Sequence, residues 1–183
     1  MFAVGPRPLT ARVQSALLWI VMLFAAAIGL GRSFVAEQEG GTVLLLRLNT
    51  RPSMVFTGKL LFNLLLVGGL TLLATGTFLL LLDISVRTPG LLATTLVLGA
   101  VGLAGATTLL AALVARAARR GPLLPVLLLP LLVPLLVAGT SATRKAIAGV
   151  PWIQAQDELL TLFGFAGAIL SAAVVLFDYV WEE

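Results

Sequence analysis

The chain has 183 residues, of which 60% are hydrophobic and 11% are charged, and its formal net charge is +4. Globular domains carry about 25% charged residues, so this composition excludes a soluble globular protein with a water-facing surface on all sides. The basic residues stand at the ends of apolar runs, which favours contacts with the lipid bilayer and predicts no binding of nucleic acid.

The sequence contains no cysteine and no histidine. Disulfides, zinc sites, Cys–His pairs and Ser–His–Asp triads are therefore excluded, and we expect no metal site, no catalytic residue and no enzymatic activity in this chain. Heme iron is usually held by His, Cys, Met or Tyr, and only Met1, Met22, Met54 and Tyr179 remain, in no convincing pair. We expect no cofactor to be bound directly.

The first predicted element is a membrane-spanning helix at residues 13–31. Its apolar run of about 18 residues extends over roughly 27 Å as a helix, which is enough to span a bilayer with little tilt. A cleaved signal peptide is the alternative, because the small residues Ala25, Ala26 and Ala27 resemble a cleavage site. The apolar run continues past them, which favours a membrane span.

Residues 34–52, called the hinge below, mix charges, glycines and apolar residues between two apolar runs. Each charge near the bilayer centre costs roughly 2.5–3.5 kcal/mol, so the hinge lies outside the hydrocarbon. Its apolar part, residues 43–48, predicts a short helix that is either a docking element for a second protein or an interfacial linker. The candidate docking residues are Phe34, Glu37, Glu39, Gly40, Gly41, Thr42, Leu45, Arg47 and Pro52.

The second predicted span covers residues 60–82 and ends in a short polar turn at residues 83–90. Asn63 and the threonines of this span can form hydrogen bonds to other helices, although threonine also bonds to carbonyl groups of its own helix. For the threonines we expect the bond within the helix.

The third predicted span covers residues 91–115, where Gly99, Gly102 and Gly105 recur at a spacing of three residues. Such a smooth face allows close approach of a neighbouring helix, so the pattern predicts packing rather than chemistry. The basic cluster at residues 116–120 follows, and the positive-inside rule places it in the cytoplasm. The hinge, two spans earlier, then lies on the cytoplasmic side, and the turn at residues 83–90 lies outside.

The fourth predicted span covers residues 123–139 and includes Pro130 and Pro134. A proline removes a backbone donor and crowds the preceding turn, so we expect this helix to bend or break there, either as a moving gate or as a fixed kink. Residues 140–158 are expected outside, and residues 159–180 form the fifth span. The predicted fold is an all-α, polytopic membrane helix bundle with five spans in a single permease domain, residues 1–183.

Two stretches together resemble a known family. The first is Phe34 followed by Glu39-Gly40-Gly41-Thr42-Val43, Pro52 and Lys59; the second is Arg119-Arg120-Gly121 followed by Leu129-Pro130-Leu131-Leu132-Val133-Pro134 and Ala138-Gly139. This order is similar to that of heme exporter protein B, the permease subunit of the ABC transporter that serves cytochrome c maturation. The resemblance covers nearly the whole chain.

The resemblance implies a multi-pass protein of the bacterial cytoplasmic (inner) membrane with six spans and a coupling helix that docks on an ATPase subunit. The hinge would be that coupling element, and the first span here would be the family's second. We therefore expect the reading frame upstream of Met1 to encode a further span. The family often has Glu where this chain has Leu44. We therefore expect a weaker charge-based contact between the hinge and the ATPase subunit.

The implied partners are the ATP-binding subunit, a second permease copy or other cytochrome c maturation membrane subunits, and a heme chaperone complex. ATP would act only through the partner, since Gly58-Lys59 lacks the rest of a phosphate loop. Heme would be transported or held by a partner. The implied function is heme export or release of a heme-loaded chaperone; the alternatives are a non-transporting membrane scaffold and an autonomous secondary transporter.

Overall fold

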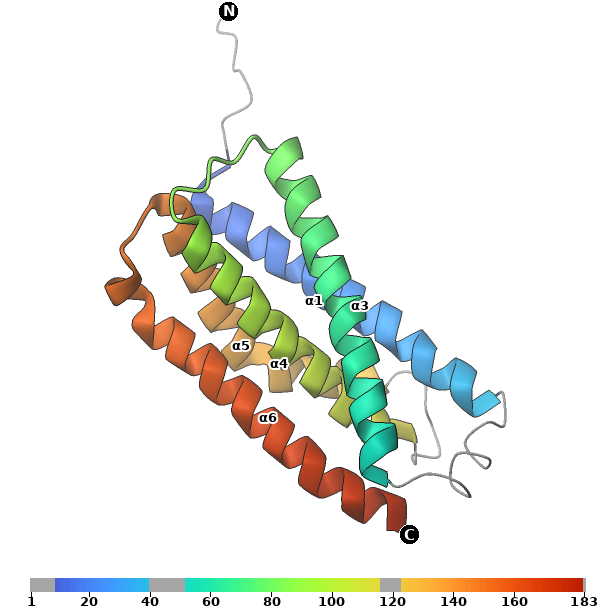
Figure 1. Ribbon diagram of the computed structural model, residues 1–183. Helices are drawn as coiled ribbons and strands as arrows, with labels where there is room; N and C mark the ends of the chain where they lie inside the picture. Colours follow the sequence, from blue (N-terminus) through green and yellow to red (C-terminus); the bar gives the residue numbers. More distant parts are fainter. Residues whose placement is uncertain (1–8, 40–51, 116–122, 183) are drawn as a thin grey trace, which may run out of the picture.

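The computed structural model describes residues 9–39, 52–115 and 123–182, with side chains placed for residues 9–27, 57–110 and 128–175. Five long helices run through the molecule, and no strand occurs in these ranges (Figure 1). They are α1 (Ala11–Glu39), α3 (Pro52–Leu81), α4 (Pro89–Ala115), α5 (Leu123–Ala148) and α6 (Gln156–Glu182), with a short 3-10 helix, η1 (Trp152–Ala155), before α6.

Four of the described helical segments are long and apolar enough to cross a membrane: Thr57–Leu81, Pro89–Leu110, Leu128–Ala148 and Trp152–Val175. A shorter apolar segment, Ala11–Ala27, belongs to α1. Helices satisfy their own backbone hydrogen bonds, which is why they are the element that an apolar chain of this kind forms in lipid. The expected all-α, polytopic membrane bundle is confirmed.

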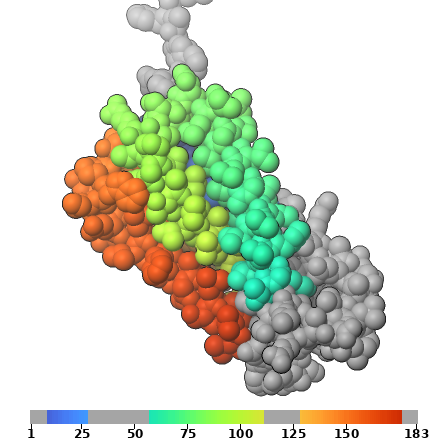
Figure 2. Space-filling model, viewed as in Figure 1, coloured from blue at the N-terminus to red at the C-terminus, as the bar shows by residue number. Residues whose placement is uncertain are grey.

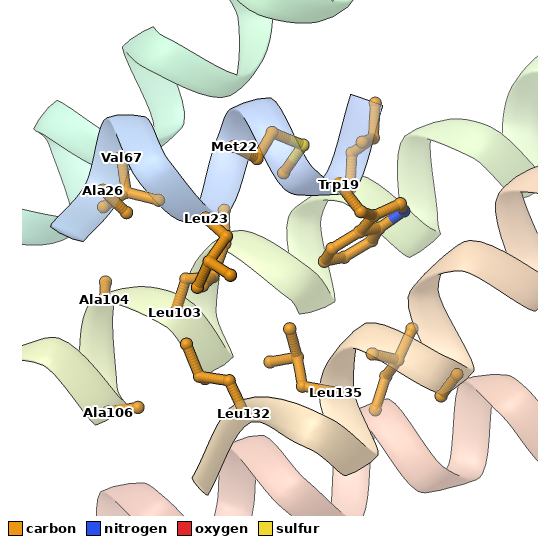
Figure 3. Close-up of a cluster of buried hydrophobic side chains, with 14 of the residues drawn as sticks. Trp19, Met22, Leu23, Ala26, Val67, Leu103, Ala104, Ala106, Leu132 and Leu135 are labelled. Carbon is orange, nitrogen blue, oxygen red and sulfur yellow. The ribbon is translucent and has the colours of Figure 1, made fainter. Parts of the chain in front are cut away.

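Helix α4 is the centre of the bundle, because it packs against all four other long helices. Within the most apolar 18-residue stretch of each helix, 67% of α4 is buried, against 17% of α3 and 22% of α6. Figure 2 shows α4 between α3 and α6 on the visible face of the molecule. The buried core lies between α4, α1 and α5 and includes Trp19, Leu103, Leu132 and Leu135 (Figure 3).

The turn between α3 and α4 is closed by backbone hydrogen bonds. Asp83 adopts a φ of 48°, in the left-handed region, and the Ile84 N–H donates to the Leu79 carbonyl at 3.2 Å. This is the pattern that commonly ends a helix, with aspartate in the position that glycine usually takes. We call this end of the bundle, which also carries the connection from α5 to α6, the turn end.

Helix α5 continues beyond the predicted end of the fourth span. It runs to Ala148, so residues 140–148, which were expected to follow the fourth span, belong to the same helix. Gly149, with a φ of 79°, ends the helix, and the Val150 N–H donates to the Lys145 carbonyl at 3.0 Å. Alanine is the best helix former, and the three alanines at the end of this segment explain the extension: Ala142, Ala146 and Ala148.

Pro130 and Pro134 lie inside α5, which is a single unbroken helix. The prolines were expected to bend or break the helix, and the structure shows that they do not break it. Both prolines are on its exposed face, while Leu128, Leu132 and Leu135 are buried on the opposite face. Packing of these leucines holds the helix across the missing backbone hydrogen bonds, as neighbouring helices commonly do in membrane proteins.

Candidate functional site

Helix α1 ends and helix α3 begins at the end of the bundle opposite the turn end (Figure 1), and the described residues of the hinge belong to these two helices. The first residues of the hinge are not a separate loop, because α1 continues through Phe34, Glu37 and Glu39, and Pro52 is the first residue of α3. Proline is favoured at the first position of a helix, where no backbone donor is needed. The remaining candidate docking residues lie outside the described residues: Gly40, Gly41, Thr42, Leu45 and Arg47.

The described part of the chain concentrates its buried polar contacts at three places in the bundle. The first is the indole of Trp19, which projects from α1 towards α4 and α5 and is fully buried (Figure 3). Its Nε1 donates a hydrogen bond to Thr143 Oγ1 at 2.9 Å. Because a buried indole N–H needs a partner, this bond fixes the orientation of the ring.

Two glycines make room for the Trp19 ring. A Cβ built on Gly99 of α4 would lie 2.2 Å from Trp19 Cη2, and one built on Gly139 of α5 would lie 2.2 Å from Trp19 Cζ2. Any larger residue would displace the indole or separate the helices. Sequence reasoning identified Gly99 but missed Trp19 and Gly139 as a packing site; the spacing of one turn between Gly139 and Thr143 is the signal that was available.

Gly102 and Gly105, the other two glycines of the smooth face of α4, also receive side chains from this same chain. A Cβ on Gly102 would lie 2.3 Å from Leu135 Cδ1, and one on Gly105 would lie 3.1 Å from Ile169 Cγ2. The smooth face of α4 is thus covered by α1, α5 and α6.

The second polar contact joins α3 to α4. Asn63 Nδ2 donates to Thr108 Oγ1 at 2.7 Å, and Thr108 Oγ1 in turn donates to the Ala104 carbonyl at 2.6 Å. Both side chains are buried, at 1% exposure each. Asn63 therefore bonds across helices. Other buried threonines of α4, Thr95 and Thr107, bond only to carbonyl groups of their own helix.

The third polar contact is an ion pair at the turn end. Lys145 Nζ of α5 lies 2.6 Å from Glu158 Oε1 of α6, and Ser141 Oγ donates to the same oxygen at 2.8 Å. The ammonium group also donates to the Gln154 carbonyl of η1. The two charged side chains are only 22% and 15% exposed. Sequence reasoning placed Glu158 outside the membrane but did not connect it with Lys145, thirteen positions earlier.

These contacts position helices, and they offer no chemistry for a reaction. Among the described residues, no group of three or more His, Cys, Asp or Glu side chains is placed to hold a metal ion. Met22 is 3% exposed and packs in the core beside Leu23 (Figure 3). Its thioether could reach an external ligand only if α1 repacked.

Comparison with known proteins gives a consistent result. A model of the CcmB protein family matches residues 1–178. Heme exporter protein B of Bradyrhizobium diazoefficiens is 35% identical over 150 residues, covering 81% of this chain and 68% of the relative. The protein of the same name from Rhodobacter capsulatus is 35% identical over 151 residues, covering 81% and 69%. No solved structure matches.

A third relative extends the similarity. Heme exporter protein B of Pseudomonas aeruginosa is 31% identical over 173 residues, covering 90% of this chain and 78% of the relative. The expected family is confirmed, and together with the apolar helices it confirms a multi-pass protein of the bacterial inner membrane. We conclude that this chain belongs to the CcmB protein family.

Proposed function

We propose that this chain is the membrane permease subunit of an ABC-type heme export system that serves cytochrome c maturation. Relatives named heme exporter protein B match most of its length, so the chain is a membrane component of a heme export system. The finer proposal is that ATP hydrolysis by a separate subunit is transmitted through the hinge. The result is heme export or the release of a heme-loaded chaperone.

The lengths of α1 and α3 carry the proposal of a docking hinge. The helices have 29 and 30 residues, which corresponds to about 45 Å each at a rise of about 1.5 Å per residue. The hydrocarbon core is only about 30 Å thick. Unless they tilt strongly, both helices therefore extend beyond the bilayer and hold the hinge in water, where a soluble ATPase can reach it.

The residues at the end of α1 suit this role. Glu37 and Glu39 are in the last turns of a helix whose first half is apolar, so the change from apolar to acidic sequence marks where the helix leaves the lipid. Pro52 starts α3 directly after the hinge. In this proposal, the end of α1 and the start of α3 hold the two ends of residues 40–51, and this segment contacts the partner.

In this proposal, the energy for transport comes from another polypeptide. Gly58-Lys59 lacks the earlier glycine and the following Ser or Thr of a phosphate loop, and both residues lie in α3. Heme, in this proposal, is cargo or a ligand of the chaperone rather than a cofactor of the chain. Other cytochrome c maturation membrane subunits and a second permease copy are proposed partners.

Two substitutions in the hinge test the proposal. Gly41→Pro should alter how the apolar residues after it are presented, and Leu45→Asp should place a charge in a buried contact. Both should prevent co-purification of the ATPase subunit while the permease still inserts in the membrane. Ile153→Asp is the matched control, because Ile153 is 77% exposed at the turn end.

The same preparations distinguish a role of the chain in transport from a role as a scaffold. If the ATPase co-purifies with both hinge variants as well as with the control, the hinge is only a linker and the proposal fails. If the complex forms but its ATP hydrolysis is the same with and without the permease, the chain acts as a scaffold.

A further inference from the structure

The face that α3 turns towards the bundle is unusually polar. Its buried residues recur every fourth position, and only one of them is apolar: Asn63, Val67, Thr71 and Thr75. Leu72 and Leu80 of the same helix point outwards, at 75% and 85% exposure. Leu64, Leu66, Ala74 and Phe78 are partly buried and pack against the core beside this face. The amide and the two hydroxyl groups among these fully buried residues lose little when water reaches them, so α3 can separate from its neighbours at lower cost than a helix whose fully buried positions are all leucine.

The two ends of the described part of α3 are held differently. Near the hinge, the buried bond from Asn63 to Thr108 fixes α3 to α4 at 2.7 Å. Towards the turn end, no side-chain hydrogen bond of the structure joins residues 71–81 to another helix among the described residues. Thr75 Oγ1 is buried without any hydrogen-bond partner. A buried unpaired hydroxyl marks a place where packing has not satisfied the polar group.

A small cavity lies beside Thr75. It is enclosed by three residues of α3 and by side chains of α1, α4 and α5, which include Leu18, Leu92 and Thr143. Figure 1 shows α3 and α4 diverging towards the turn end. Figure 2 shows α1 in blue through the gap between them. Among the described residues, the turn-end half of α3 therefore borders a small cavity and has no side-chain hydrogen bond to another helix.

Two adjacent glycines separate the fixed and the loose halves of α3. A Cβ built on Gly68 or Gly69 would meet nothing within 4 Å, so packing within the chain does not require glycine there. Gly99 and Gly139, in contrast, are needed to admit Trp19. Glycine is a poor helix former, and bends in helices are concentrated at glycine and proline.

We propose that residues 71–81 of α3 form a movable wall of the bundle, which bends away from α1, α4 and α5 at Gly68-Gly69 while the bond from Asn63 to Thr108 stays closed. Opening joins the small cavity to the water at the turn end and hydrates Thr71 and Thr75. It leaves the rest of the turn end in place, because α5 is tied there to α1 by Trp19 and to α6 by Lys145.

Thiol labelling in native membranes tests this movement without any assumption about the cargo. The chain has no cysteine, so a single Thr75→Cys reports on that position alone, in the full chain with its partners. A thiol reacts as the thiolate, which requires contact with water. Thr95→Cys is the reference, because Thr95 is fully buried on α4 and lies outside the proposed opening.

We expect a small methanethiosulfonate to modify Thr75→Cys at a measurable rate and Thr95→Cys far more slowly. Adding Gly68→Ala and Gly69→Ala should slow the reaction at position 75 by about tenfold, since both replacements favour the straight helix. The matched control is Gly164→Ala with Gly167→Ala, two glycines of α6 whose Cβ positions are also open. This pair should leave the rate unchanged.

Two results would overturn the proposal: equal rates at positions 75 and 95, or equal slowing by the two alanine pairs. The second would mean that the alanines act through general stability of the bundle. If Thr75→Cys does not accumulate in the membrane, Leu79→Cys replaces it, because Leu79 lines the same cavity and is half-buried. The same rates and the same contradicting outcomes apply at that position.

Discussion

Trp19 Nε1 and Thr143 Oγ1 lie 2.9 Å apart, and their hydrogen bond joins the first described helix to α5 across 124 positions of sequence. The indole fits between Gly99 and Gly139, whose missing side chains leave the space that it fills. Trp19 alone therefore fixes the distance of α1 from both α4 and α5. Packing of this kind drives helix association in lipid, where the hydrophobic effect gives little preference between a neighbouring helix and the acyl chains.

The first prediction concerns this contact. Gly139→Ala should destabilise the protein by about 1–3 kcal/mol, because the new methyl group overlaps the indole and forces it to move. Thr143→Val should cost about 1–3 kcal/mol by leaving the indole N–H unpaired. Thermal unfolding of the purified protein in detergent measures both. Gly164→Ala, at an open position of α6, is the control and should be neutral or slightly stabilising; equal loss in all three variants would contradict the assignment.

The second prediction concerns Lys145 and Glu158. Lys145→Met and Glu158→Gln should each destabilise the protein by roughly 1–3 kcal/mol, between the values for exposed and fully buried ion pairs. The exchange of both, Lys145→Glu with Glu158→Lys, should restore only part of the loss, because Glu158 lies in the first turn of α6, where the helix dipole favours a negative charge. Unfolding in detergent again gives the measurement. A double variant no better than the worse single variant would show that the pair is not coupled.

The third prediction concerns topology. In intact cells, an impermeant thiol reagent should label Ser85→Cys and Ile153→Cys but not Thr50→Cys, since the basic cluster at residues 116–120 places the hinge in the cytoplasm. The structure puts Ser85 and Ile153 at the turn end and exposes both. Permeabilised cells provide the control, in which all three should react. Labelling of Thr50→Cys alone in intact cells would reverse the orientation.

The fourth prediction concerns heme. The purified chain titrated with heme should show no defined Soret shift from axial ligation, because it has no His or Cys and Met22 is buried in the core. Met54→Leu should titrate identically to the unchanged chain. A stoichiometric shift that Met54→Leu abolishes would show direct ligation, and the proposal that heme is only cargo or partner-held would then have to be abandoned.

The sequence could predict most of the element order but not all the boundaries. Apolar runs bounded by charge predicted helices close to those observed, because the cost of charge in lipid is a local property of each segment. The fourth span was predicted to end at residue 139, whereas helix α5 continues to Ala148. Its continuation from Thr140 to Ala148 contains Arg144 and Lys145, which hydropathy assigns to water, whereas the ion pair with Glu158 accommodates one of them inside the bundle.

By itself, the sequence determined that this is an apolar, all-helical membrane protein, and it indicated the family through the hinge and the proline segment. Only the tertiary structure decided which faces pack together. Leu72 and Leu132 are the same residue type in two apolar helices, yet the first is 75% exposed and the second is fully buried. In lipid a leucine gains little from facing a helix rather than an acyl chain, so the apolar pattern does not encode its direction. That direction follows from fits such as Trp19 between two glycines, which join residues far apart in sequence.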